Sequence, residues 1–143
     1  PLHIVHPFQV GKAENEDSIA LYGNIGGQNI FTAGDLNQTG ESAIAAKYPN
    51  MRVDILKLGH HGSKTSSNPA VIKQWQPKVG IVSAGRNNRY HHPHMETLKT
   101  IQDQQMTLFN TQTHGMIRYN YTRKKGQFEV KLNHELATTT TTN

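Results

Sequence analysis

Three polar segments of this chain carry side chains that could bind a metal ion or hydrolyse an ester. Asp35 ends an apolar run, His60 and His61 open a loop rich in glycine and hydroxyl groups, and residues 87–94 contain three further histidines. The chain has no cysteine, so a metal site must use imidazole, carboxylate or water ligands. An aspartate with imidazoles suits Zn²⁺ or Mn²⁺, and a bridging aspartate can hold two cations about 3.5 to 4 Å apart for attack on phosphorus or carbonyl carbon.

Each segment also has a purely structural interpretation. Asp35 follows Gly34 and could cap its own turn. The loop from His60 to Ser67 could be hydrophilic without function, because glycine and serine are common in loops. Any one of the histidines at 91, 92 and 94 could cap a helix or be solvated. All three segments follow apolar runs, however, so neighbouring strands in one sheet would bring them to the same edge.

Basic residues accompany these segments. Lys57, Lys64, Arg86 and Arg89 lie in or beside them, and the whole chain carries 15 Lys and Arg against 10 Asp and Glu, a formal charge of +5. Cations around a metal site suit an anionic substrate, and a net positive charge favours polyanionic partners. Surface Lys and Arg also simply keep proteins soluble.

The elements that must position these segments alternate between strands and helices. Alternating β-rich runs predict strands, whereas amphipathic stretches with capping residues predict helices, including one opened by Asn68 and Pro69 and another opened by His92 and Pro93. The predicted strands are 18–22, 29–32, 53–58, 79–82, 106–109, 116–121 and 128–132, and the predicted helices cover 39–48, 69–75 and a segment from 92 to about 102. This order predicts a layered α/β fold with its chemistry in loops at strand ends.

Length and composition limit the alternatives. A chain of 143 residues with 34% hydrophobic residues can bury one core, and it contains no apolar run of 18 residues that could span a membrane. The chain starts at Pro1 without an initiator Met or a signal region, and we interpret it as part of a longer protein. Residues 136–143 have the composition of a polar tail, which we expect to be flexible.

The segments together resemble a known family. The residues that carry the resemblance are 31–35 (FTAGD), Glu41, 54–66 (DILKLGHHGSKTS), Pro77, 81–85 (IVSAG), 88–90 (NRY) and 92–93 (HP), with Asn15, Asp17, Ser18, Thr111 and Gly115 as minor signatures. In this order they resemble the carboxyl-terminal metallo-β-lactamase-like domain of the ComEC/Rec2 competence proteins. The match spans roughly residues 14 to 121 of the 143.

The resemblance implies a fold and a function. Residues 1–135 would be the second half of a metallo-β-lactamase αββα sandwich, a layered α/β fragment. The intact protein would be a polytopic membrane protein of a transformable bacterium that takes up DNA. Its metallo-β-lactamase-like domain, on the extracellular face, would act as a metal-dependent DNA phosphodiesterase using Zn or Mn.

The resemblance also assigns roles by position. The catalytic residues would be Asp35, His60 and His92, with Asp35 as a bridging carboxylate and His92 in substrate contact or proton transfer. The metal ligands would be Asp35 with His60 or His61, of which we favour His60. Substrate binding would fall to Ser63, Lys64 and Arg89, which would face the phosphodiester.

Two departures from the family pattern change these expectations. The chain lacks the His-x-Asp-x-Asp-His cluster of the first half of the domain, so we expect weak or no metal binding and no nuclease activity from this chain alone. His91 stands where relatives usually have glycine, which leaves open whether His91, His92 or His94 approaches the site.

The expected partners are DNA, the amino-terminal half of the same domain and the membrane channel of the same protein. Half a sandwich exposes apolar surface, so a homo-oligomer through that surface is a further expectation. Two alternative functions are a non-catalytic DNA-binding or docking module of the uptake channel and a hydrolase of another phosphoester.

Overall fold

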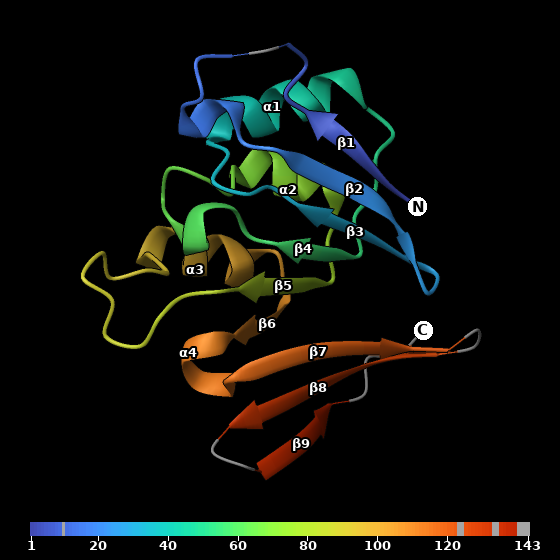
Figure 1. The fold of residues 1–143 in the computed structure, drawn as a ribbon, viewed down its shortest axis with the longest axis vertical. Coiled ribbons are helices and arrows are strands. Elements are labelled where there is room, and N and C mark those ends of the chain that lie inside the picture. The colour runs from blue at the N-terminus through green and yellow to red at the C-terminus, as the bar shows by residue number, and fades with distance from the viewer. Residues whose placement is uncertain (10, 123–124, 133–134, 140–143) are drawn as a thin grey trace.

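One mixed sheet forms the centre of the molecule. The computed structural model describes residues 1–9, 11–122, 125–132 and 135–139. Six strands lie in the order β1-β2-β3-β4-β5-β6, antiparallel from β1 to β3 and parallel from β3 to β6 (Figure 1). Their bounds are Leu2–His6 (β1), Ala20–Ile25 (β2), Gln28–Thr32 (β3), Ile55–Lys57 (β4), Val79–Val82 (β5) and Thr107–Asn110 (β6).

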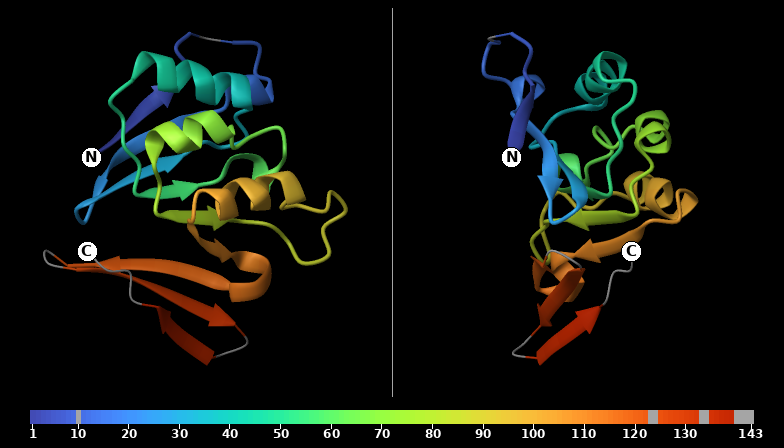
Figure 2. Two further views of the ribbon diagram at one scale, coloured as in Figure 1. Left: turned by 180° about the vertical axis from the view of Figure 1, so that it is seen from behind. Right: turned by 90° about the vertical axis from the view of Figure 1, so that its right-hand side faces the viewer.

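Three helices cover one face of this sheet (Figure 2). They are α1 (Gln38–Lys47), α2 (Pro69–Trp75) and α3 (Met95–Asp103), and the shorter helical turns are η1 (Asn15–Asp17), η2 (Gly59–Gly62) and α4 (Thr111–His114). Asn68 caps α2 as expected, because its side chain accepts a hydrogen bond from the Ala70 backbone N–H at 2.9 Å. The core between helices and sheet includes Phe31 and Trp75, whose ring centroids are 4.6 Å apart.

A small antiparallel sheet packs on the opposite face. It contains β7 (Met116–Tyr121), β8 (Gly126–Leu132) and β9 (Glu135–Thr139) in that order. Phe128 and Val130 of β8 bury themselves against Ile55, Val79 and Phe109 of the main sheet. The mixed α/β class is therefore confirmed, with helices on one face and a second sheet on part of the other.

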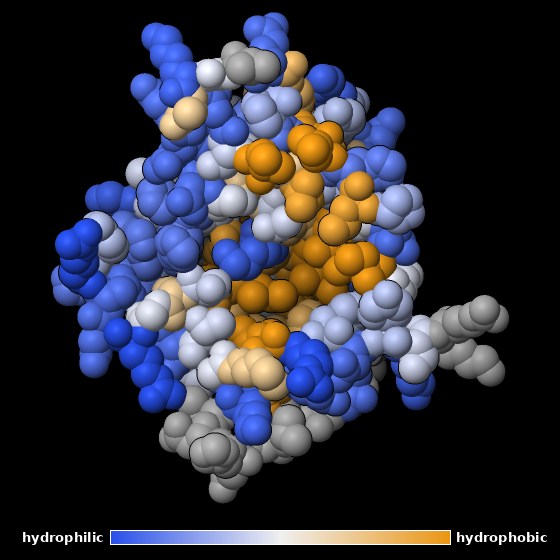
Figure 3. Space-filling model, viewed as in Figure 1, coloured by the Kyte–Doolittle hydropathy of each residue, from blue (hydrophilic) through white to orange (hydrophobic). Residues whose placement is uncertain are grey.

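The amino-terminal part of this second face remains uncovered. The register aligns Ile4 with Leu21 across β1 and β2, and Leu2 with Gly23. Ile4 is 66% exposed and Leu2 is 50% exposed, and Figure 3 shows hydrophobic side chains gathered on this face. No helix in the described part of the chain is long and apolar enough to cross a bilayer.

Besides strand ends that shift by up to three residues, the structure differs from the sequence predictions in the following details. Leu2–His6 forms an edge strand that the sequence analysis did not assign, and Thr111–His114 forms an unassigned short helix. The helix expected to open at His92 begins at Met95 instead, with His94 in the extended cap position. Residues 136–139 of the segment predicted as a tail lie in β9, which pairs with β8. Residues 140–143 lie outside the described residues.

Candidate functional site

The three polar segments meet at one edge of the main sheet. Asp35 follows β3, the turn η2 with His60 and His61 follows β4, and residues 83–94 follow β5. These strands are parallel, so their carboxyl ends share an edge. The His60 backbone N–H donates to the Gly34 carbonyl at 2.9 Å, which ties the turn of Asp35 to the histidine pair.

The histidine pair sits on an unusual backbone. His60 and His61 have φ values of 44° and 57°, and Gly62 follows at 82°, so three consecutive residues are left-handed. Side chains other than glycine adopt this region at a cost of about 1–3 kcal/mol each, and such residues cluster at functional sites. A Cβ on Gly62 would lie 2.7 Å from the Cβ of Pro93, so glycine here permits close approach of the third segment.

Three imidazoles form a cluster, which we call the histidine cluster: His60, His61 and His92. The ring centroid of His92 lies 5.6 Å from that of His60 and 6.2 Å from that of His61, and the rings of His60 and His61 are also 6.2 Å apart. His92 is buried at 9% exposure, whereas His60 is half-buried and His61 exposed. The cluster thus opens to solvent on the side of His61.

The orientation of His61 leaves one nitrogen free for a ligand. Its Nδ1 lies 2.7 Å from the Ser83 carbonyl oxygen, so Nδ1 carries the proton and donates it there. Nε2 then keeps its lone pair. A carbonyl that fixes the tautomer in this way is the usual outer contact of a metal-binding histidine.

Asn88 and Gln112 hold His92 by its backbone. The Asn88 side chain accepts from the His92 N–H at 2.9 Å and donates to the His92 carbonyl at 2.8 Å. Gln112, from α4, donates to the same carbonyl at 2.9 Å. A cavity of about 350 Å³ is lined by these residues together with His91 and Asn110. The sequence analysis placed Asn88 in a motif without a role and did not single out Gln112, because a side-chain contact to a backbone group across the loop leaves no periodic signal.

The structure separates the three histidines of the third segment. His94 accepts a hydrogen bond from the Lys64 backbone N–H through Nδ1 and donates to the Tyr90 carbonyl through Nε2, both at 3.0 Å. Both of its ring nitrogens are therefore occupied: Nδ1 joins the loop after β4, and Nε2 bonds within the loop after β5. His91 is exposed, with a left-handed φ of 56°. Of the three, His92 is the one whose ring lies against those of both His60 and His61.

Electrostatics connect Asp35 to this cluster. Burial lowers the pKa of His92, the neighbouring rings of His94, His60 and His61 lower it further, and the Asp35 carboxylate opposes them. Burial also lowers the pKa of Lys57, again opposed by Asp35. The Asp35 carboxylate thus favours the charged form of both a buried imidazole and a half-buried ammonium.

The three residues predicted to bind substrate occupy different environments. Ser63 is buried, and its hydroxyl bonds to the Thr65 hydroxyl at 3.0 Å inside the loop, so it shapes the loop. Lys64 is exposed next to the cluster. Arg89 is exposed and packs over the ring of Tyr90, at 4.7 Å from the centroid. Tyr90, 57% exposed and stacked on His92, has no role in the sequence analysis.

A metal ion fits part of this arrangement. Asp35, His60 and His61 supply oxygen and nitrogen donors of the kind that Zn²⁺ and Mn²⁺ accept, and the bond from His61 Nδ1 to the Ser83 carbonyl leaves Nε2 for a ligand. Within the residues that the structure describes, no three His, Asp or Glu side chains are already gathered as a metal-binding group. These residues can therefore provide some ligands of a metal site.

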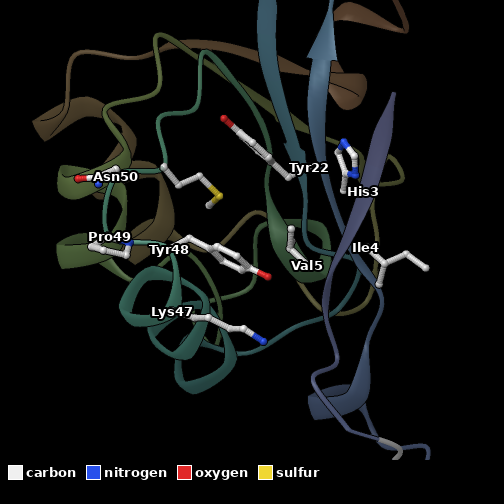
Figure 4. A pocket seen from close by; sticks show the side chains of 9 residues that line it. His3, Ile4, Val5, Tyr22, Lys47, Tyr48, Pro49 and Asn50 are labelled. Carbon is white, nitrogen blue, oxygen red and sulfur yellow. The ribbon is translucent and has the colours of Figure 1, made fainter.

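A separate pocket lies away from this edge. It has a volume of about 680 Å³ between β1 and the end of α1, and its lining includes His3, Tyr22, Lys47 and Tyr48 (Figure 4). It contains none of the residues predicted to act on substrate or metal.

Comparison with known proteins identifies the family. No family model matches the chain. ComE operon protein 3 of Bacillus subtilis is 39% identical over 142 residues, which are 99% of this chain and 18% of the relative. Recombination protein 2 of Haemophilus influenzae is 30% identical over 112 residues (78% and 14%), and competence protein ComA of Neisseria gonorrhoeae is 31% identical over 111 residues (77% and 16%). The chain spans less than a fifth of the length of these curated relatives, and it belongs to the ComEC/Rec2 family of competence proteins.

Proposed function

We propose that this chain is part of a metal-dependent DNA phosphodiesterase domain in a bacterial protein that takes up transforming DNA. The observation that supports the proposal is that Asp35, the histidine pair and His92 each follow one of three parallel strands at the same sheet edge, where the His60 N–H donates to the Gly34 carbonyl and the rings of His60, His61 and His92 cluster. One relative is named for recombination and another for competence, and these names support DNA as the substrate that we propose.

In this proposal Asp35, His60 and His61 hold the divalent metal, Zn or Mn. Asp35 offers two carboxylate oxygens, and His61 offers Nε2 while Ser83 fixes its ring. The metal, when bound, activates water and polarises the phosphate. His92 is the proton-transfer group, because its lowered pKa keeps the imidazole neutral near pH 7 and able to accept a proton.

The exposed cations recognise the DNA backbone. Lys64 and Arg89 flank the cluster and can reach phosphate oxygens from solvent. Ser63 is buried, so in this proposal it acts by shaping the loop that presents Lys64. Contacts to phosphate carry no base information, and they give binding that does not depend on sequence.

The rest of the protein completes the domain. We propose that the remaining metal ligands come from an amino-terminal half of a metallo-β-lactamase-like sandwich, which packs on the uncovered face of β1 and β2. Metal binding by the 143-residue chain alone is then weak or absent. The complete domain works beside the membrane channel of the same protein, on the extracellular face.

The test is Asp35→Asn in the full-length protein, assayed with Mn²⁺ on linear DNA. We expect cleavage to fall by about 100-fold or more, while the affinity for DNA changes less than about twofold, because the substitution removes a metal ligand and no phosphate contact. Asp103→Asn is the matched control, since Asp103 is an exposed carboxylate on α3 paired with Lys99. Unchanged cleavage in Asp35→Asn would sink the enzymatic proposal and leave a DNA-binding module.

A further inference from the structure

A buried carboxylate lies beside the site without belonging to it. Glu41, in the first turn of α1, is only 4% exposed. Its two oxygens accept separate backbone hydrogen bonds, Oε1 from the Ser67 N–H at 2.8 Å and Oε2 from the Asn68 N–H at 2.7 Å. Neither ion pair found among the described residues includes Glu41.

These two bonds fix the end of the loop that carries His60 and His61. Ser67 has a left-handed φ of 61°, and Asn68 is the cap of α2. Glu41 therefore holds the loop at the point where its backbone turns into the next helix. Few side chains other than a carboxylate can accept from two consecutive amides at once.

The same turn of α1 holds the loop at further points. The Gln38 backbone N–H donates to the Thr65 carbonyl at 2.8 Å, and its side-chain amide donates to the Lys64 carbonyl at 2.9 Å. Because α1 starts three residues after Asp35, this turn connects the carboxylate to the imidazole loop. The first turn of α1 thus holds the far end of the loop, while the bond from the His60 N–H to the Gly34 carbonyl holds its start beside Asp35.

A buried carboxylate is a costly way to join two elements. Burial raises the pKa of Glu41 to about 7, despite the two hydrogen bonds that favour the ionised form. An apolar contact at the same place would avoid the cost of removing this group from water. The carboxylate fixes the orientation of two adjacent backbone amides, which an apolar contact cannot do. Its role is therefore to set the geometry of the loop more than to stabilise the fold.

We propose that Glu41 is a positioning residue, which sets the placement of His60 and His61 relative to Asp35 by clamping the Ser67 and Asn68 amides. The proposal rests on the proposed function for its catalytic consequence, but its structural part is independent of metal and DNA. Both carboxylate oxygens of Glu41 are used by these backbone bonds.

The structural part is tested by NMR on the 143-residue chain, without metal, in Glu41→Gln and in the charge-matched control Asp103→Asn. In Glu41→Gln we expect amide hydrogen exchange of Ser67 and Asn68 to quicken by about tenfold or more, since at least one acceptor is lost. The ring resonances of His60 and His61 should shift, while the amide of Ile101 in α3 keeps its exchange rate. Exchange rates and ring resonances equal to those of Asp103→Asn would overturn the proposal.

The unchanged chain gives a second test if Glu41→Gln does not fold. The Ser67 and Asn68 amides must then exchange about 100-fold more slowly than an exposed loop amide such as that of Asn87. Exchange as fast as that of Asn87 would show that the carboxylate does not hold them and would also overturn the proposal.

The catalytic consequence is tested in the full-length protein. Glu41→Gln should lower kcat for DNA cleavage about tenfold with KM unchanged, and Glu41→Asp, which keeps the charge, should recover part of the loss. Equal kcat in Glu41→Gln and wild type, where wild type cleaves DNA, contradicts the positioning role. If the wild-type protein does not cleave DNA, the proposed function is contradicted instead. The hydrogen-exchange experiment still tests whether Glu41 holds the Ser67 and Asn68 amides.

Discussion

The histidines of this chain differ in what their ring nitrogens contact. His94 uses both nitrogens, Nδ1 for the loop after β4 and Nε2 for its own loop, whereas His61 bonds to Ser83 through Nδ1 and leaves Nε2 without such a bond. Sequence reasoning could locate these residues at strand ends, but it could not distinguish His91, His92 and His94, which lie within four positions. Their separation depends on the left-handed backbone at His91 and on contacts from Asn88, Lys64 and Gln112.

At the residue scale, the pKa of His92 tests whether the Asp35 carboxylate lies close enough to the histidine cluster to affect its protonation. Neighbouring rings lower this pKa and Asp35 raises it. Asp35→Asn should therefore lower the pKa of His92 further, and His61→Gln should raise it. Both shifts can be measured by NMR titration of the His92 ring in the 143-residue chain with a chelator present. If neither substitution moves the titration, the carboxylate and the rings do not share a site.

The same pKa has a consequence for stability. The ordinary pKa of histidine is 6.5, and that of folded His92 is lower, so the unfolded chain binds this proton more readily. His92 therefore lowers the free energy of unfolding as the pH falls from 6.5 toward its folded pKa. Glu41 has the opposite effect, because its pKa rises from 4.5 to about 7 on folding and the buried charge forms as the pH rises through this range.

At the element scale, the strands and helices with strong local signals were predictable. The β5 strand and α2 have the predicted bounds, because a continuous apolar run and an Asn-Pro cap are local features. The strand β1 was not predicted, since an edge strand gains its partners from β2 eighteen residues later. The short helix α4 was missed because four residues contain too few positions for a helical period.

The approach of the loops after β4 and β5 is also an element-scale feature. Gly62→Ala should destabilise the chain more than Gly27→Ala, by about 1–3 kcal/mol, since the added methyl group meets Pro93. Gly27 is a matched control: its φ of 84° resembles the 82° of Gly62, and a Cβ there has no neighbour within 4 Å. Urea denaturation of both variants measures the difference. Equal free energies of unfolding would show that the two loops can separate at little cost.

At the scale of the whole molecule, the main sheet presents two unequal faces. Three helices cover one face, and among the described residues β7 and β8 cover the part of the other face near β3 to β6. The uncovered part carries Leu2 and Ile4, among the most exposed large apolar side chains of the described residues. The expectation of a homo-oligomer through this surface stays a prediction, as does packing by an amino-terminal half-domain.

The charge of the whole molecule gives the last prediction. The formal charge of +5 attracts DNA in general, but the proposed site uses Lys64 and Arg89 at the carboxyl edge of the sheet. The binding constant of the full-length protein for duplex DNA should fall with salt, and replacing both residues with alanine should reduce the logarithmic slope by about 1.8, or 0.9 for each phosphate contact. Fluorescence anisotropy over a range of salt concentrations measures this slope.

A control variant that loses two positive charges elsewhere distinguishes binding at the proposed site from general electrostatic attraction. Lys73 and Lys78 are both exposed and line a hollow beside the start of β5, at the opposite end of that strand from Arg89. Replacing them with alanine removes the same charge and should leave the slope close to that of wild type, because long-range attraction between exposed charges is screened within about 10 Å at 0.1 M salt. If both double variants lose the same amount of slope, DNA binds the positively charged surface with no preference for the edge where Asp35 and the histidine cluster lie.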